Sequence, residues 1–193
     1  MNVVRPIEQD EEPRVAELTL DDFRTLDEAG ALAGRKVELI EGVLFEVAPQ
    51  QIRHARFKSR LATRLGNVLA DLGSSLEMLV EVTIAMPAKS APEPDIVLAD
   101  EQQESDDYAM LSTVALVIKV ANTTYRFDRG DKLALYASNG IPEYWIADLK
   151  RERIEQFWDP ADGDYRQTRT IKLGESIESA TVADLAVDTA GLL

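Results

Sequence analysis

Apolar residues recur at three- and four-residue steps between Ile52 and Leu72, which predicts a helix with one buried face. Gly73, directly after this run, is typical of a helix end. The apolar face is formed by Phe57, Leu61, Leu65, Val68 and Leu72.

Two shorter helices are expected on the strength of their ends. Thr19 can cap a helix that stops near Gly30. Asp128 can cap a second helix that runs to Asn139, because Gly140 there is a strong stop signal.

Strands are predicted where apolar residues alternate or form short continuous runs. A hairpin with a turn at Glu41-Gly42 is expected over residues 36–47. Together with the helices, these segments indicate an α/β (α+β) fold, a mixed β-sheet flanked by helices. The other expected strands are 77–86, 95–98, 116–121, 143–148 and 153–158, and the last two form a hairpin.

Length and composition limit the possible classes of protein. The 193 residues suffice for one domain, expected at 17–193 behind a loose polar tail at 1–16. No apolar run approaches the roughly 20 residues that a membrane helix needs, so no membrane partner is expected. The chain has no cysteine and no secretory signal pattern, which favours a cytoplasmic location.

The net charge of −14 argues against a protein that coats nucleic acid nonspecifically, although a local basic patch is compatible with it. With a single histidine, His54, a site built on a histidine pair is impossible. No glycine-rich phosphate loop and no metalloprotease motif is present.

Lys119 interrupts the apolar run at 116–121, which otherwise reads as a central strand covered on both faces. A buried ammonium must find a partner, reach water or lose its proton. The polar run at 122–132 follows directly; helix capping and solvated charge explain its aspartates but not Lys119.

Two further patterns could carry chemistry. Asp95 opens a short strand behind "PEP". An aspartate in this position is more often a polar strand end that faces solvent, and the functional alternative is a metal-binding carboxylate.

Four arginines lie within roughly 80° of one another on the long helix, at 3.6 residues per turn. They are either a solvated face that covers core residues or a phosphate-contacting strip. These are Arg53, Arg56, Arg60 and Arg64.

The order of "VELIEG", His54, "PEPDIVL", "LVIKV" and "FDRGDKLALYASNGIPEYWIAD" resembles the bacterial Uma-type (Uma two) family of predicted endonucleases. That family belongs to the PD-(D/E)XK, restriction-endonuclease-like superfamily. The resemblance spans Thr19 to the C-terminus. It implies a metal-dependent DNA endonuclease (a hydrolase of phosphodiester bonds), with Mg²⁺ or Mn²⁺ as cofactor, DNA as partner and a possible homodimer.

The resemblance also assigns residues. Asp95 matches the metal-binding aspartate, Val120 would add its carbonyl, and Lys132 matches the downstream lysine that orients water. Glu38 and His54 match the glutamate of the hairpin and the histidine before the long helix. The four helix arginines and His54 are the candidates for nucleic-acid contact.

The resemblance implies a glutamate at position 119, where this chain has lysine. Two unit charges ~4 Å apart interact by about 4 kcal/mol at an effective dielectric near 20, so this exchange opposes cation binding. We expect Lys119 to pair with Asp95, with Glu38 as a further candidate partner.

Three outcomes follow from that exchange. The chain is a catalytically degenerate nuclease-fold protein that binds nucleic acid or a protein partner without cleavage. Alternatively, Lys119 points away, and Asp95 and Glu38 hold a weaker metal. As a third outcome, the lysine is an introduced change. A structural protein with an acidic surface is a further, less specific alternative, and strongly reduced or absent cleavage is the favoured prediction.

Overall fold

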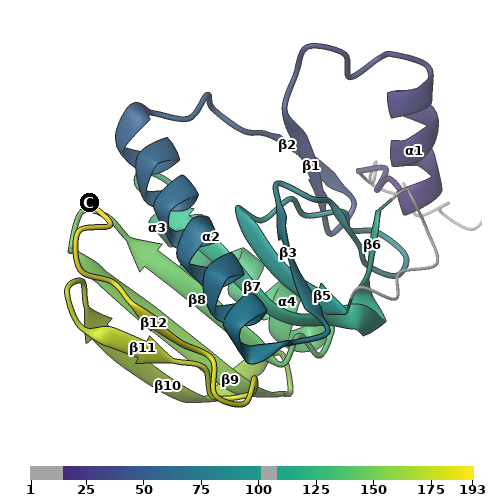
Figure 1. Cartoon of the computed structure of the whole chain (residues 1–193). Helices are drawn as coiled ribbons and strands as arrows, with labels where there is room; N and C mark the ends of the chain where they lie inside the picture. Colours follow the sequence, from purple (N-terminus) through teal and green to yellow (C-terminus); the bar gives the residue numbers. More distant parts are fainter. Residues whose placement is uncertain (1–14, 101–107) are drawn as a thin grey trace, which may run out of the picture.

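The computed structural model describes residues 15–100 and 108–193. These residues form a six-stranded sheet in the order β10-β9-β8-β7-β5-β3 (Figure 1). β7 and β8 are parallel, and the other neighbouring pairs are antiparallel. The predicted mixed sheet is confirmed. Its strands are β3 (Leu76–Val80), β5 (Ile96–Asp100), β7 (Val114–Ala121), β8 (Glu143–Asp148), β9 (Arg153–Ala161) and β10 (Asp164–Lys172).

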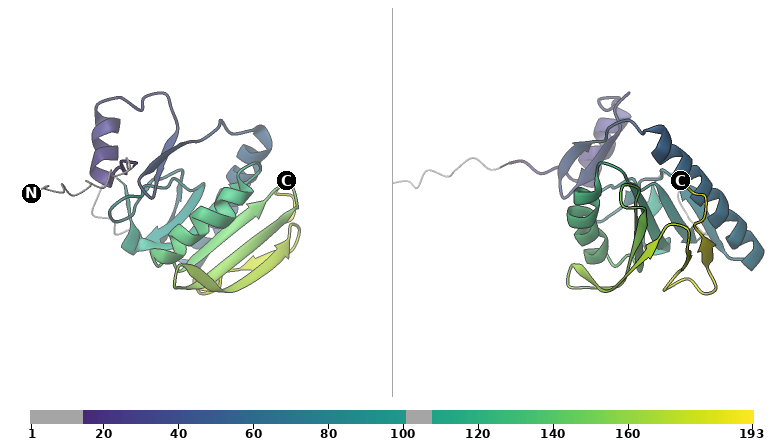
Figure 2. Two further views of the ribbon diagram at one scale, coloured as in Figure 1. Left: turned by 180° about the vertical axis from the view of Figure 1, so that it is seen from behind. Right: turned by 90° about the vertical axis from the view of Figure 1, so that its left-hand side faces the viewer.

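Helices cover both faces of this sheet. α2 (Ile52–Leu72) packs on one face, and α4 (Leu133–Ser138) lies on the other (Figure 2). Alternate residues of β7 belong to the two cores: Ile118 packs with the α2 side, whereas Val117 packs with the α4 side. This period of two decides which polar side chains can meet on each face.

The long helix has the predicted bounds. Most of its apolar stripe is buried against the sheet, but Leu72, expected in the stripe, is exposed at the helix end. Gly73 ends the helix in the left-handed conformation with φ 60°. Burial of this stripe, rather than helix propensity alone, stabilises the helix. The buried apolar residues with the largest side chains are Phe57, Leu61, Leu65 and Leu69.

The N-terminal part is also close to the prediction. Thr19 caps α1 (Leu20–Glu28) through a capping box with Asp22. β1 (Val37–Ile40) and β2 (Val43–Glu46) form the expected hairpin. Gly42 in its turn has φ 80°, and an added Cβ would lie 2.7 Å from Glu17 Cβ, so a larger residue does not fit. Of the expected tail at 1–16, only residues 15 and 16 are described.

Two predicted elements are wrong in their extent. The strand expected at 77–86 ends at Val80, because Glu81 adopts a left-handed φ of 54° that breaks the ladder. The chain then forms β4 (Ile84–Ala85), which pairs with β6 (Ala109–Met110).

The helix expected from Asp128 begins earlier, as α3 (Tyr125–Phe127). It continues through a π-helical turn, η2 (Asp128–Lys132), into α4. Asp128 is therefore an interior residue and caps nothing.

The remaining strands close the C-terminal side. β8 and β9 form the expected hairpin, although β9 extends to Ala161 rather than residue 158. A short helical turn, η1 (Leu111–Thr113), precedes β7, and β11 (Ser176–Glu178) pairs with β12 (Ala186–Asp188). None of the helices in the described ranges is long and apolar enough to span a bilayer.

Candidate active site

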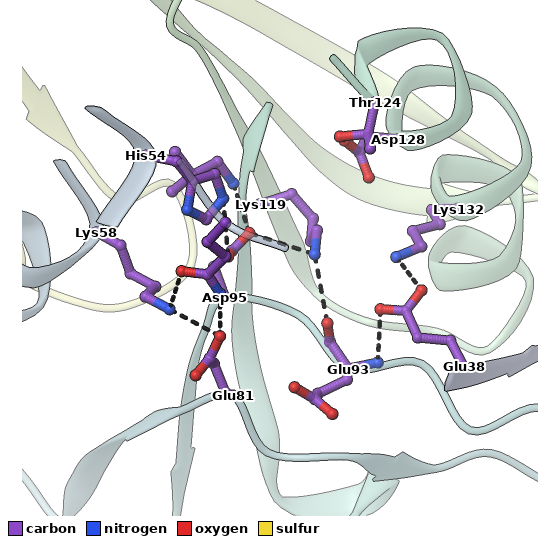
Figure 3. Close-up of polar contacts among 12 residues, drawn as sticks. Glu38, His54, Lys58, Glu81, Glu93, Asp95, Lys119, Thr124, Asp128 and Lys132 are labelled. Carbon is purple, nitrogen blue, oxygen red and sulfur yellow. Dashed lines mark hydrogen bonds and ion pairs between the residues drawn. The ribbon is translucent and has the colours of Figure 1, made fainter. Parts of the chain in front are cut away.

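The register of the sheet brings Asp95 and Lys119 together. Ile96 of β5 pairs with Ile118 of β7, so one further step places Asp95 opposite Lys119 on the α4 face. Lys119 Nζ lies 3.2 Å from Asp95 Oδ2 (Figure 3). The expected contact between these two side chains is confirmed.

Both carboxylate oxygens of Asp95 are engaged. Oδ2 also accepts a hydrogen bond of 2.8 Å from the Val120 backbone N–H, and Oδ1 lies 3.1 Å from His54 Nε2. Burial opposes ionisation, but the charge of Lys119 and the His54 and Val120 contacts outweigh it and hold the pKa of the Asp95 carboxyl below its usual range. Asp95 is therefore an ionised, fully engaged carboxylate.

Lys119 stays inside the protein. Its side chain is 11% exposed, and Nζ also donates to the Glu93 carbonyl oxygen at 3.3 Å. Burial disfavours the ammonium, yet attraction from Asp95, then Asp128 and Glu38, raises the pKa of Lys119 above its ordinary value. The alternative in which Lys119 points away from Asp95 is wrong.

Glu38 and Lys132 form a second buried pair beside the first. Their carboxylate and ammonium are in direct contact, and Glu38 Oε1 accepts from the Glu93 backbone N–H at 3.2 Å. Burial and repulsion by Lys119 lower the pKa of Lys132, whereas Glu38 opposes that shift. The direct partner of Glu38 is thus Lys132, whereas Glu38 acts on Lys119 through its charge and not through an ion pair among the described residues.

A third set of ionic contacts at this edge was not foreseen from the sequence. Lys58 lies 2.8 Å from Glu81, and Lys36 lies 2.9 Å from Glu81 and 2.6 Å from Glu93. Burial raises the pKa of Glu81, but Lys58 and Lys36 outweigh it and lower that pKa to about 2. Lys58 follows His54 by one helical turn, which is the one sequence signal that could have indicated it.

Asp128 is fully buried behind the pairs. It accepts a 2.6 Å hydrogen bond from Thr124 Oγ1, and burial raises its pKa although Lys119 and Lys132 oppose that shift. Its Oδ1 has no hydrogen-bond partner within the described part of the chain. Asp128 is therefore a buried acid with a stabilised neutral form.

Glu38, Asp95 and Lys119 border a cleft of about 250 Å³. The turn after β7 forms its rim, where Asn122 Nδ2 donates to Gln51 Oε1 at 2.7 Å. The polar residues on its wall include Lys36, Glu38, Gln50, Gln51, His54, Asp95, Lys119, Asn122, Thr123 and Thr124.

The site does not fit a divalent metal ion. Mg²⁺ requires about six oxygen ligands in near-octahedral geometry. Asp95 has no uncommitted oxygen, and the Val120 group that contacts it is the N–H rather than the carbonyl expected as a ligand. Among residues 15–100 and 108–193, no group of three or more acidic or histidine side chains could hold a metal.

The four helix arginines do not form a free strip. Arg60 donates to carbonyl oxygens of the last three residues, at 3.0 Å for Leu193, and Arg64 donates to Ala190 O at 2.6 Å. Arg53 lies 3.4 Å from Glu152. Only Arg56 is exposed without a partner among the described residues. Arg60 and Arg64 thus hold the C-terminal segment.

The mixed six-stranded sheet with helices on both faces defines a fold of the restriction-endonuclease-like class. A solved structure described as "a putative nuclease belonging to DUF820 from Anabaena variabilis" is similar to this chain, with a TM-score of 0.68. The two are 15% identical over 91% of this chain and 97% of the other, a likeness that shows the fold.

A family model assigns the chain more closely. The model described as "Uma2: Putative restriction endonuclease" matches residues 20–190, so the chain belongs to the Uma2 family. No curated protein matched the sequence.

Proposed function

We propose that this chain is a nucleic-acid-directed member of its family in which metal-dependent DNA cleavage is strongly reduced or lost. The single observation that supports the proposal is the position of Lys119 Nζ, 3.2 Å from Asp95 Oδ2. A cation bound to Asp95 would have to displace or adjoin a fixed positive charge. At ~4 Å that repulsion is about 4 kcal/mol at an effective dielectric near 20.

The candidate site residues nevertheless lie together at one edge of the sheet, which supports the family-level part of the proposal. Asp95 stands at the head of β5, Lys132 is held by Glu38, and His54 reaches Asp95 from the start of α2. A glutamate at position 119 would give Asp95 an acidic neighbour at the same edge. A hard divalent cation prefers such oxygen ligands.

Plasmid nicking in Mg²⁺ or Mn²⁺ tests this proposal. The unaltered chain is expected to leave supercoiled DNA intact, whereas Lys119→Glu is expected to nick it. The matched control is Lys119→Glu combined with Asp95→Ala, which should lose the gained activity.

Two results would contradict the proposal. Nicking by the unaltered chain that disappears in Asp95→Ala would show that Lys119 does not block the site. Intact DNA with both the unaltered chain and Lys119→Glu would remove the nuclease interpretation of this edge.

Binding of DNA without cleavage is the companion part of the proposal. Arg53 and Arg56 are the helix arginines whose side chains are not tied to the C-terminal segment. We expect binding that weakens with salt and weakens further in Arg53→Ala/Arg56→Ala. Binding that is insensitive to salt in a filter or anisotropy assay would contradict this part.

A further inference from the structure

Lysine instead of glutamate at position 119 changes the net charge of the cleft, and with it the kind of ion that the cleft favours. Its wall carries two cationic side chains, Lys36 and Lys119, and two carboxylates, Glu38 and Asp95, so with neutral His54 the formal charge is zero. A glutamate at position 119 would make that charge −2. With Lys119, the cleft therefore lacks the net negative charge that attracts a cation.

The two carboxylates on the wall are already satisfied. Asp95 is held by Lys119, His54 and the Val120 N–H, and Glu38 is held by Lys132 and the Glu93 N–H. Each of their four oxygens already contacts a donor, so a bound cation would have to compete with these contacts. Their negative charge is also balanced by an adjacent ammonium, which reduces repulsion of an anion.

Donors, in contrast, remain available in the cleft. An ammonium has three N–H groups, and Lys119 uses two of them, toward Asp95 Oδ2 and the Glu93 carbonyl. Thr123 adds an exposed hydroxyl on the rim. The stabilised charge of Lys119 means that its remaining N–H is a charged donor, the kind that binds oxyanions most strongly.

From this balance we infer that the cleft binds a phosphate oxyanion, with the Lys119 ammonium in place of a metal ion. The inference rests on the proposed function, since it names the group of a nucleic acid that the non-cleaving site would hold. A terminal or bridging phosphate offers acceptor oxygens to the N–H of Lys119 and the O–H of Thr123. Lys119 thus both neutralises Asp95 and contacts the ligand.

Nuclear magnetic resonance of the unaltered chain tests the inference directly. Titration with inorganic phosphate should produce saturable shifts of the backbone amides of Val120, Asn122 and Thr123. A short single-stranded oligonucleotide should shift the same amides if the phosphate of a nucleic acid is the natural ligand. Shifts with inorganic phosphate alone would assign the site to a free phosphate group.

The matched variants are Lys119→Gln and Lys89→Gln. Lys89 pairs with Glu17 on the surface and does not border the cleft. Loss of the charged donor should weaken phosphate binding about ten-fold in Lys119→Gln, whereas Lys89→Gln should bind as the unaltered chain does.

Absence of saturable shifts at these amides, or equal affinity in Lys119→Gln, would overturn the inference. Either result leaves the nicking assay unaffected, so failure of phosphate binding and failure of the proposed function can be distinguished.

Discussion

Two buried carboxylates, Asp95 and Glu143, are satisfied in different ways. Asp95 lies between Lys119 and His54, so its charge is balanced by groups that carry or can carry a positive charge. Glu143 is fully buried at the start of β8 and accepts six hydrogen bonds, two at Oε1 and four at Oε2, all from neutral donors. The donors are Trp145, Gln156, Ser179, Ala180 and Thr181, which contributes two.

We call Glu143 the structural carboxylate, because it fixes segments of the chain. We call Asp95 the exchangeable carboxylate, because one substitution can replace the charge that balances it. Neutral donors around Glu143 come from three segments and fix the chain before β12 against the sheet. At Asp95 one side chain, Lys119, supplies the balancing charge and also borders the cleft. We therefore expect a single substitution to change the ion preference of the Asp95 site, whereas the six neutral donors around Glu143 offer no single charge to replace.

The largest expected effect is at the structural carboxylate. Glu143→Ala should lower the free energy of unfolding by roughly 4 kcal/mol, because several buried donors lose their acceptor together. Urea unfolding measures the change. Glu178→Ala, an exposed side chain in β11, is the control and should change stability by less than about 0.5 kcal/mol. Similar stabilities of the two variants would remove the structural role of Glu143.

The next effect is at the exchangeable carboxylate. Lys119→Met should lower the free energy of unfolding by about 3 kcal/mol at neutral pH, because it leaves Asp95 buried without its cation. Combining it with Asp95→Asn should recover part of that loss, which a double-mutant cycle measures. Strictly additive losses would mean that the two side chains are not coupled.

Acidification should weaken the ionic edge. The folded-state pKa values of Asp95 and Glu81 lie below their ordinary values, that of Glu81 at about 2. Their stabilisation is therefore complete above the usual carboxyl range and is lost as the pH falls through the folded values. Asp128, with a raised pKa, has the opposite sign and loses its contribution as the pH rises.

A series of urea unfolding curves between about pH 5 and pH 2 checks this expectation. The free energy of unfolding should fall with pH, and Asp95→Asn should flatten that fall. An unchanged slope in Asp95→Asn would show that its carboxyl does not contribute.

The smallest expected effect is on the arginine helix. Arg60→Ala should cost roughly 1 kcal/mol of stability, because it removes hydrogen bonds to the C-terminal carbonyls. Arg56→Ala, on the same helix but without such partners, should change stability by less than about 0.5 kcal/mol. Thermal unfolding compares them, and equal melting temperatures would mean that Arg60 does not hold the segment.

The contact of Asp95 with Lys119 could be predicted because the ordered motifs resemble a family whose metal-binding carboxylates fall at these two positions. Asp95 heads a strand and Lys119 interrupts another, and the alternation of side chains puts both on one face once the strands pair. The partner of Glu38 could not be predicted, because Lys132 reaches it from the π-helical turn η2, which the sequence did not indicate.

The structural carboxylate could not be predicted from the sequence. Its donors come from β8, β9 and the turn at 179–181, and no local pattern marks them. The break of the strand at Glu81 was equally hidden, because a positive φ at a residue other than glycine depends on contacts distant in sequence. Arg60 and Arg64 looked available because the fold of the C-terminus was unknown.

Calorimetric titration of Mg²⁺ into the unaltered chain and into Lys119→Glu tests most directly whether Lys119 replaces the ion. We predict no measurable binding to the unaltered chain and saturable binding of one ion to Lys119→Glu, which Asp95→Ala abolishes. Saturable Mg²⁺ binding to the unaltered chain, lost in Asp95→Ala, would contradict the account.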